Sequence, residues 1–273
     1  MHAASRQALA ALREHLDSAT ARFSTADGFI GLADELYQVV DLLVSQPRLR
    51  RNLADPTTHA ERRAALAGSL FDDKLGAGAA GLVREAVSLR WSSPWDLLDA
   101  IEIAADDALF GAAAQVEVTD EVEDELFRFG RILDADARLS TLLDDASASV
   151  ARRAALVREL VGDKVHLITQ TLLQHAVASQ RKRIVTHSID DLLALSAQRR
   201  KRSMAQVISA VELTAQQQSR LAAALSQTYG RAITVRTAVD PAVRGGLVIR
   251  VGDEIIDGSI AARLATAKAD LAG

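Results

Sequence analysis

Two stretches of the chain, RLRRNLADPTTHAERRAALAGSLFDDK at residues 48–74 and RLSTLLDDASASVARRAALVRELVGDK at residues 138–164, align without a gap at an offset of 90 residues. Twelve of the 27 aligned positions are identical, including the double arginine Arg62-Arg63, which recurs as Arg152-Arg153. Solenoid repeats have periods of roughly 20–50 residues, whereas this period is the size of a small domain. The sequence therefore predicts a duplicated domain.

The residues within each copy follow a helical pattern. Leu9, Leu12 and Leu16 recur at steps of three and four, and Phe23 continues the same face, which indicates an amphipathic helix. A hydroxyl at Thr58 followed by a carboxylate at position 61 predicts a capping box that opens another helix. Aromatic residues make up only 4% of the chain and there are four prolines, a composition that favours long, alanine-rich helices.

One helix is expected to serve both copies. At the offset of 90 residues, the first helix of the first copy, residues 4–23, falls on residues 94–113, which are also the last helix of that copy. We therefore predict a helical bundle at residues 1–113, a second bundle at 114–202 that shares helix 94–113, and a third domain at 203–273. A shared helix would join the two bundles rigidly.

The third domain has a different periodicity. Residues 205–213, 232–239, 246–251 and 254–257 read as strands, and Thr214 with Gln217 forms a capping box for a helix between the first two strands. Gly252-Asp253 is a two-residue loop suited to a hairpin turn, and a last helix is expected at residues 259–272. The predicted fold class is mostly α, with two tandem helical bundles followed by a small α+β domain.

The glycine-rich end of the chain raises the question of a phosphate-binding loop. Such a loop places a glycine-rich turn between a strand and a helix, with a lysine in reach of the anion. Here the glycine pair precedes a strand, and an aspartate stands where the anion would bind. We interpret the following residues as turn and cap positions rather than catalytic ones: Gly245, Gly246, Gly252, Asp257, Gly258 and Ser259.

Composition excludes several other classes of function. The chain has no cysteine, its six histidines lack metal-ligand spacing, and no Ser/His/Asp grouping or carboxylate pair appears, so we expect no metal, cofactor or catalytic site. No apolar run is long enough to span a membrane, and no signal peptide opens the chain. Basic runs at 181–183 and 199–202 leave a nucleic-acid-binding adaptor as the alternative, although no aromatic residue lies between them and the net charge is −4.

The C-terminal region carries a resemblance to a known family. A strand at 205–213, Asp240-Pro241, Gly245-Gly246-Leu247, Gly252-Asp253, Ile256-Asp257-Gly258-Ser259 and a leucine-containing last helix together resemble the delta subunit of the F-type ATP synthase, whose mitochondrial relative is the oligomycin-sensitivity-conferring protein. The helical part is similar to the N-terminal bundle of that family, so the resemblance covers the whole chain. The duplication is a departure, because the usual member has one bundle.

The resemblance implies a non-catalytic stator subunit. Such a subunit lies at the cytoplasmic face of the cell membrane as part of the complex, without a membrane span, and supports ATP synthesis coupled to proton transport. It joins the catalytic α/β head to subunit b of the peripheral stalk and resists the torque of the rotor. We expect the N-terminal segments of the α subunits to bind between the helices marked by Leu9, Leu12, Leu16 and Phe23 and by Leu82 and Trp91. We expect Leu264 and Leu271 to form or support the docking surface for subunit b.

Overall fold

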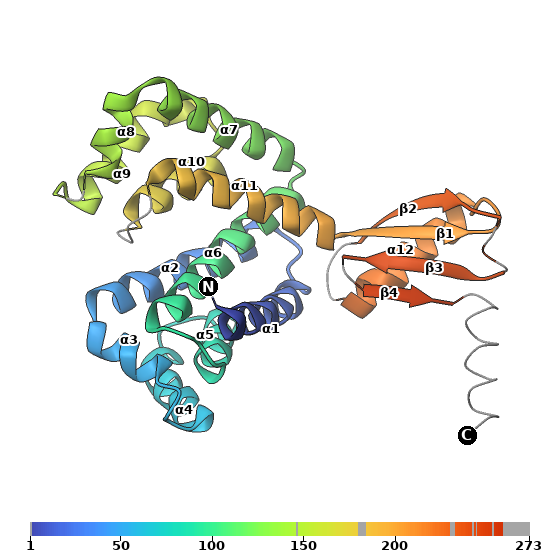
Figure 1. Cartoon of the computed structure of the whole chain (residues 1–273), viewed down its shortest axis with the longest axis horizontal. Helices are drawn as coiled ribbons and strands as arrows, with labels where there is room; N and C mark the ends of the chain where they lie inside the picture. Colours follow the sequence, from blue (N-terminus) through green and yellow to red (C-terminus); the bar gives the residue numbers. More distant parts are fainter. Residues whose placement is uncertain are drawn as a thin grey trace. The chain divides into compact units, whose positions relative to one another are not determined.

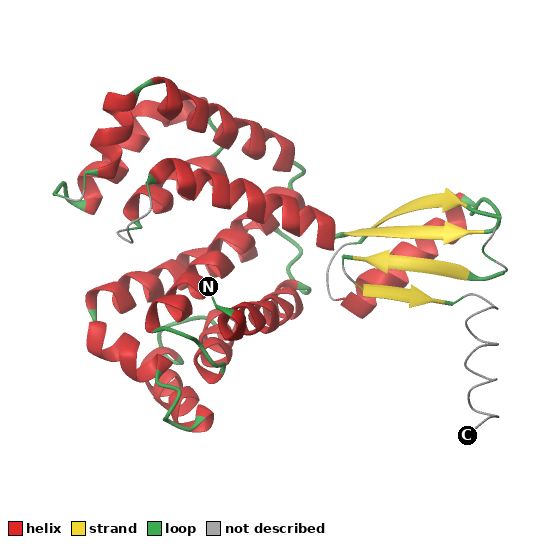
Figure 2. Ribbon diagram, viewed as in Figure 1, coloured by secondary structure: helices red, strands yellow, loops and turns green. Residues whose placement is uncertain are grey.

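The computed structural model describes residues 2–145, 147–179, 184–229, 233–241, 243, 245–252 and 254–258. The chain divides into two compact units, Met1–Ser196 and Ala197–Gly273, and each is described by itself (Figure 1). The first unit is built from helices, and the second contains a four-stranded sheet with a helix (Figure 2). The fold is therefore mostly helical with a small C-terminal α+β part.

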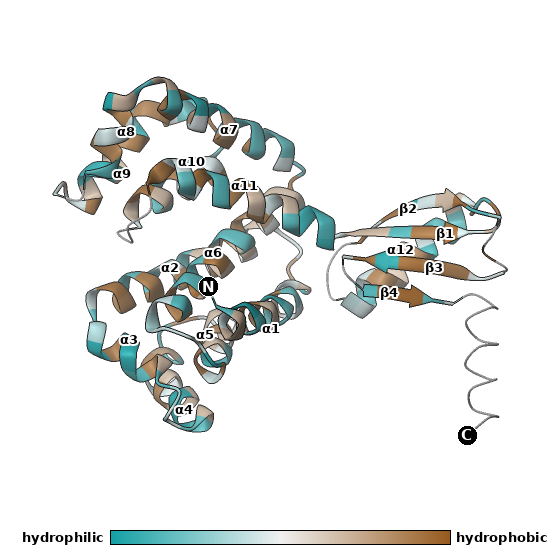
Figure 3. Cartoon of the chain, viewed as in Figure 1, coloured by the Kyte–Doolittle hydropathy of each residue, from teal (hydrophilic) through white to brown (hydrophobic). Residues whose placement is uncertain are grey.

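The helices of the first unit follow one another through short connections. They are α1 (Ala3–Thr20), α2 (Ala26–Ser45), α3 (Pro47–Ala54), α4 (Ala60–Phe71), α5 (Ala77–Ser88), α6 (Pro94–Gln115), α7 (Thr119–Ala135), α8 (Ala137–Asp144), α9 (Val150–Val161), a 3-10 turn η1 (Gly162–Lys164), α10 (Leu167–Ala178) and α11 (Val185–Arg202), whose last residues belong to the second unit. Figure 3 shows polar and apolar residues alternating along most of these helices, as expected for amphipathic helices around a shared core.

Two helix starts illustrate how local sequence sets the boundaries. α6 begins with Pro94, and the Ser93 hydroxyl accepts hydrogen bonds from the backbone N–H groups of the next two residues, each at 3.2 Å. The capping box predicted at Thr58 is wrong, because α4 is preceded by His59 and has no side-chain cap. The Thr58 hydroxyl instead donates to the carboxylate of Asp55, which also accepts the backbone N–H of Thr57 at 2.9 Å.

The first unit contains two series of helices with matching bounds. We call α2–α5 the first series and α7–α10 the second series. Each of α8, α9 and α10 begins and ends 90 residues after α3, α4 and α5, respectively. The polar contacts match as well: the Glu35 carboxylate accepts the backbone N–H of Gly76 at 3.0 Å, and Glu125 accepts that of His166 at 3.0 Å.

Helix α6 lies in the middle of the first unit. It contacts α1, α2, α3, α5, α7 and α10, and most of its circumference is buried. The apolar core runs without a break from Ala8 in α1 to Leu195 in α11. The two series therefore share one core within this unit, and α6 passes through it.

The sheet of the second unit has the order β2-β1-β3-β4. Its strands are β1 (Met204–Ser209), β2 (Thr234–Val239), β3 (Leu247–Val251) and β4 (Glu254–Asp257). β2 is parallel to β1, whereas β3 is antiparallel to β1 and to β4. The parallel connection contains α12 (Ala215–Tyr229), whose Leu225 packs with Ala205 and Val207 of β1 and Ile249 and Val251 of β3.

Two sequence predictions for this unit are confirmed. The backbone N–H of Thr214 donates to the Gln217 side chain at 2.9 Å, and the backbone N–H of Gln217 donates back to the Thr214 hydroxyl at 3.3 Å, which is the predicted capping box. β3 and β4 pair Val251 with Glu254 across the predicted two-residue loop. The last predicted helix, residues 259–272, lies outside the described residues.

Candidate partner-binding site

The residues predicted on the first helix lie at different depths. Leu12 and Leu16 of α1 are buried in the core, and Leu9 is half-buried and packs against it. Phe23 lies beyond the end of α1, and its ring packs edge-on against Phe29 of α2 with 5.2 Å between the ring centroids. The leucines of α1 therefore pack into the core and hold this helix in place, while its opposite face is exposed.

The residues predicted near α5 also belong to the core. Leu82 is buried, and Trp91, which follows α5, is buried with its indole N–H donating to the backbone carbonyl of Ala86 at 2.6 Å. Trp95 is the exposed member of the tryptophan pair, and the guanidinium of Arg50 lies 3.6 Å from the centre of its ring system. Trp91 thus fastens the end of α5, while Trp95 faces solvent.

The line along which α1 and α5 run in contact is here called the α1/α5 seam. A side chain added at Gly81 would meet one atom within 4 Å, the Nε2 of His15 at 3.8 Å. Glu85 follows one turn later on the same face of α5 and is partly exposed. Sequence periodicity missed His15 and Gly81, and the available signal was a glycine inside a helix, where it costs about 1 kcal/mol relative to alanine.

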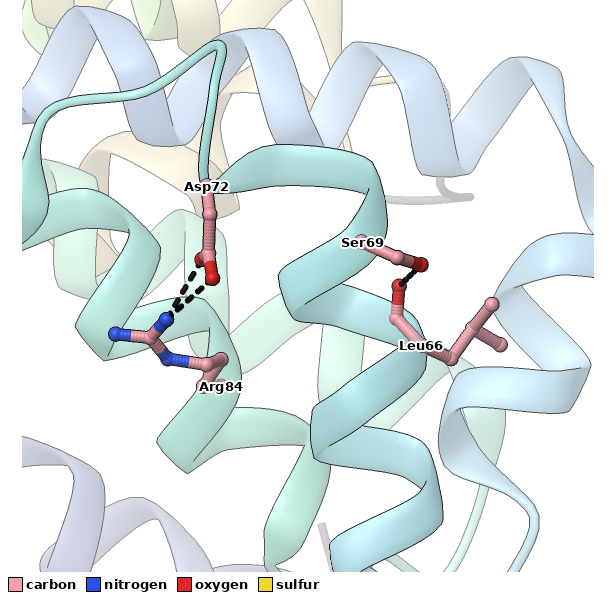
Figure 4. A network of polar contacts seen from close by, with 4 residues as sticks. All are labelled: Leu66, Ser69, Asp72 and Arg84. Atoms are coloured by element: carbon pink, nitrogen blue, oxygen red, sulfur yellow. Dashed lines mark hydrogen bonds and ion pairs between the residues drawn. The ribbon is translucent and has the colours of Figure 1, made fainter.

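A surface ion pair joins α4 to α5 beside this seam. One guanidinium nitrogen of Arg84 lies 2.7 Å from each carboxylate oxygen of Asp72, and both side chains are 43% exposed (Figure 4). In the same view the Ser69 hydroxyl donates to the carbonyl of Leu66 at 2.8 Å within α4. Exposed ion pairs of this kind stabilise proteins only weakly, so this pair contributes little to holding α4 against α5.

A buried polar cluster connects α2, α6 and α10. The Tyr37 hydroxyl donates to Oδ1 of Asp106 at 2.5 Å, and the Tyr37 ring stacks on His175 with 3.4 Å between centroids and 4° between planes. Burial lowers the pKa of His175 to about 4, and burial beside the Asp106 carboxylate raises the pKa of Tyr37 well above its usual value. Both rings are therefore neutral near pH 7.

Three glycines of the second unit have positive φ. Gly245, Gly246 and Gly252 have φ values of 68°, 86° and 60°, a region that favours glycine. Asp257 ends β4, and a Cβ at Gly258 would lie 3.2 Å from the backbone carbonyl of Leu247. The other C-terminal residues singled out from the sequence lie outside the described residues: Ser259, Leu264 and Leu271.

Other functional classes find little support in the described residues. Among them no group of three or more His, Asp or Glu side chains is placed to hold a metal ion. Within the same residues, no helix has the length and apolar character needed to cross a membrane. The basic run 199–202 forms the last turn of α11, where positive charge interacts favourably with the helix dipole, and the run 181–183 lies outside the described residues.

Comparison with known proteins gives a consistent result. The sequence model of the family described as ATP synthase delta (OSCP) subunit matches residues 106–271. The chain is 45% identical to the ATP synthase subunit delta of Streptomyces avermitilis over 271 residues, covering 99% of this chain and 98% of that protein. It is 42% identical to the subunit delta of Streptomyces griseus subsp. griseus over 273 residues, covering all of both chains.

A third relative has a longer chain. The ATP synthase subunit b-delta of Mycobacterium sp. (strain KMS) is 40% identical over 271 residues, a match that covers 99% of this chain and 61% of that protein. The full-length matches and the family model point to the same family. The chain therefore belongs to the ATP synthase delta (OSCP) subunit family, the non-catalytic peripheral-stalk component of the F-type ATP synthase.

Proposed function

We propose that this chain links the catalytic α/β head of the ATP synthase to subunit b and holds the head against the torque of the rotor. In this role it supports ATP synthesis coupled to proton transport from the cytoplasmic face of the cell membrane, without spanning the membrane. A coupling of this kind requires two docking surfaces and no reactive group. The family membership and the mixture of a helical unit with a separate α+β unit support the proposal.

The helical unit is built, in this proposal, from two copies of one domain, at residues 1–113 and 114–202, with α6 as the last helix of the first copy and the first helix of the second. Three observations support it. The bounds of α3–α5 recur 90 residues later in α8–α10, the Glu35 contact recurs at Glu125, and α6 contacts helices of both series. The family model also begins to match at residue 106, within α6.

The head-docking surface is the α1/α5 seam. An N-terminal segment of an α subunit would lie there as an amphipathic helix, with its apolar face on the seam. The observation that carries this assignment is Gly81: the glycine weakens α5, and space for a side chain exists above it, so folding alone does not account for a residue without a Cβ. A glycine at that place lets a partner helix approach the backbone closely.

Filling the seam tests this assignment. Gly81→Leu should abolish binding of a peptide carrying the N-terminal segment of the α subunit, measured by titration calorimetry, while α5 gains helix propensity and the fold is kept. Gly31→Leu is the matched control, because Gly31 lies inside α2 and an added Cβ there meets nothing within 4 Å. Unchanged affinity after Gly81→Leu would remove the α1/α5 seam from this role.

The C-terminal unit is the docking surface for subunit b in this proposal. The relative named subunit b-delta carries both subunit names in a single chain, which supports proximity of the two subunits. Deleting residues 259–273, which include Leu264 and Leu271, should release subunit b in a pull-down while binding of the α-subunit peptide is kept. Retention of subunit b by the shortened chain would contradict this part of the proposal.

A further inference from the structure

The second series has its own counterpart of the α1/α5 seam. α10 begins and ends 90 residues after α5, and α6 occupies the place of α1 at the start of the second series. α6 and α10 are in contact, and the line between them is here called the α6/α10 seam. At the offset of 90 residues, the residue of α10 that corresponds to Glu85 is His175, and the residue of α6 that corresponds to His15 is Ala105, the neighbour of Asp106.

His175 and Asp106 are the residues that hold Tyr37. Its hydroxyl donates to Asp106 on α6, and its ring stacks on His175 on α10, so the side chain lies across the α6/α10 seam. Tyr37 belongs to α2, which packs along α6. The chain thus places a side chain of its own helix α2 across the α6/α10 seam.

The burial of Tyr37 depends on this contact. Tyr37 is 3% exposed, whereas its counterpart in the second series, Phe127 of α7, is 56% exposed. An aromatic residue at this place in a series therefore points away from the series' own core. Tyr37 is covered because α6 and α10 lie over it, and Phe127 has no such cover among the described residues.

From this arrangement we infer that Tyr37 of α2 permanently closes the α6/α10 seam, so that the chain accepts one α-subunit helix, on the α1/α5 seam, and not two. The number of α-subunit helices bound rests on the proposed function. The closed state of the α6/α10 seam rests only on the contacts of Tyr37. The Tyr37 hydroxyl is satisfied by its hydrogen bond to the carboxylate, and the stacked rings exclude water. Opening the seam would break both contacts, so the closed arrangement has the lower free energy.

Stoichiometry tests the first part. Titration calorimetry of the full chain with the α-subunit N-terminal peptide should give one peptide per chain. Gly81→Leu should abolish that binding, and Thr171→Leu, the matching substitution on α10, should leave it unchanged. Two peptides per chain, or one peptide lost on Thr171→Leu and kept on Gly81→Leu, would overturn the inference while leaving head binding intact. No peptide bound at all would instead overturn the proposed function.

Thiol labelling tests the closed seam without any partner. The chain has no cysteine, so Tyr37→Cys and Phe127→Cys each introduce a unique thiol at matching places. Maleimide should label Cys variants at position 37 at least about tenfold more slowly than at 127, with or without the α-subunit peptide, because labelling at 37 requires a local opening. Circular dichroism establishes that both variants are folded. Equal labelling rates, or acceleration at 37 on adding peptide, would show that the seam is open at position 37 and would overturn the inference.

Discussion

The two series of helices use corresponding residues at their corners but fasten them differently. Arg63 of α4 and Arg153 of α9 stand 90 residues apart, and both are buried. Nε of Arg63 donates to the carbonyl of Val87 at 2.7 Å, and one of its terminal nitrogens donates to the carbonyls of Ser88 and Leu89 at 3.0 and 3.1 Å. Arg63 therefore caps the C-terminal end of α5 with positive charge.

The other terminal nitrogen of Arg63 closes the connection from α3 to α4. It donates to the carbonyl of Asp55 at 3.0 Å and to that of Thr58. Arg153 makes a single hydrogen bond within the described residues, to the carbonyl of Leu143 at 3.4 Å, and its Nε is buried without a partner there. Two arginines at matching places in the two series can thus differ in the contacts that make such a residue stabilising.

Replacing the two arginines separately should give the largest contrast. Arg63→Met should lower the free energy of unfolding by about 3–4 kcal/mol, since it leaves several carbonyls at the end of α5 without a donor. Arg153→Met should cost about 1 kcal/mol or less, because it removes a buried nitrogen that is already unsatisfied. Urea unfolding followed by tryptophan fluorescence suits the measurement, as Trp91 and Trp95 both lie in the first unit. Equal losses would show that the corners are equivalent.

The counterparts Glu85 and His175 sharpen the comparison through pH. The pKa of His175 is lowered to about 4 in the folded chain by burial, from the usual 6.5, so the folded state favours the neutral ring. Below pH 6.5 the unfolded chain binds the proton more readily, and stability should fall by about 3 kcal/mol between pH 6.5 and pH 4. Well above pH 6.5 both states hold the neutral ring, and the histidine contributes no pH dependence.

The contribution of His175 is isolated by His175→Gln. This variant should lose part of the stability slope between pH 4 and pH 6.5, measured by urea unfolding at a series of pH values against the wild-type chain. Glu85→Gln, at the matching place in the first series, controls for a general effect of substituting a polar residue at this place. An unchanged slope in His175→Gln would mean that burial does not hold the ring neutral in the folded chain.

The capping glutamates should differ by a smaller amount. Glu125 accepts the backbone N–H of His166 and the Thr169 hydroxyl, the latter at 2.5 Å, whereas Glu35 accepts only the backbone N–H of Gly76 among the contacts resolved for it. Glu125→Ala should cost about 2 kcal/mol and Glu35→Ala about 1 kcal/mol in the same unfolding assay. A larger loss at Glu35 would reverse the order expected from the hydrogen bonds.

Sequence reasoning captured the periodic features of the fold. The offset of 90 residues recurs in the bounds of α3–α5 and α8–α10. The helix starting at Pro94, the Thr214 capping box and the Gly252 hairpin follow from local patterns. The Thr58 cap was wrong because Asp55, three residues earlier, competes for the same hydroxyl. Two hydroxyl-and-carboxylate patterns that look alike can therefore differ through a neighbour that the pattern does not include.

The candidate site was less accessible to sequence reasoning. Helical spacing correctly placed Leu12 and Leu16 on an apolar face, but spacing cannot distinguish burial in the protein's own core from burial against a partner. The stack of Tyr37 on His175 joins residues from α2 and α10, and nothing local to either residue indicates it. Of the two residues that mark the α1/α5 seam, His15 and Gly81, only Gly81 carried a local signal in the sequence. A glycine inside a helix lowers the stability of that helix, so its presence suggests another role.

The smallest effect is expected at the corner between α4 and α5. Asp72 pairs with Arg84 in the first series, whereas the matching residues of the second series are Gly162, with φ of 42°, and Gln174, which cannot form an ion pair. Because both partners are 43% exposed, a double-mutant cycle of Asp72→Asn and Arg84→Gln should give a coupling of about 0.5 kcal/mol that shrinks as salt is added. A coupling several times larger and insensitive to salt would mean that this pair, and not Arg63, distinguishes the first series from the second. α5 forms part of the seam proposed to bind the head. If Arg63, and not the ion pair, fixes the position of α5, the variants of the cycle should bind the α-subunit peptide with unchanged affinity.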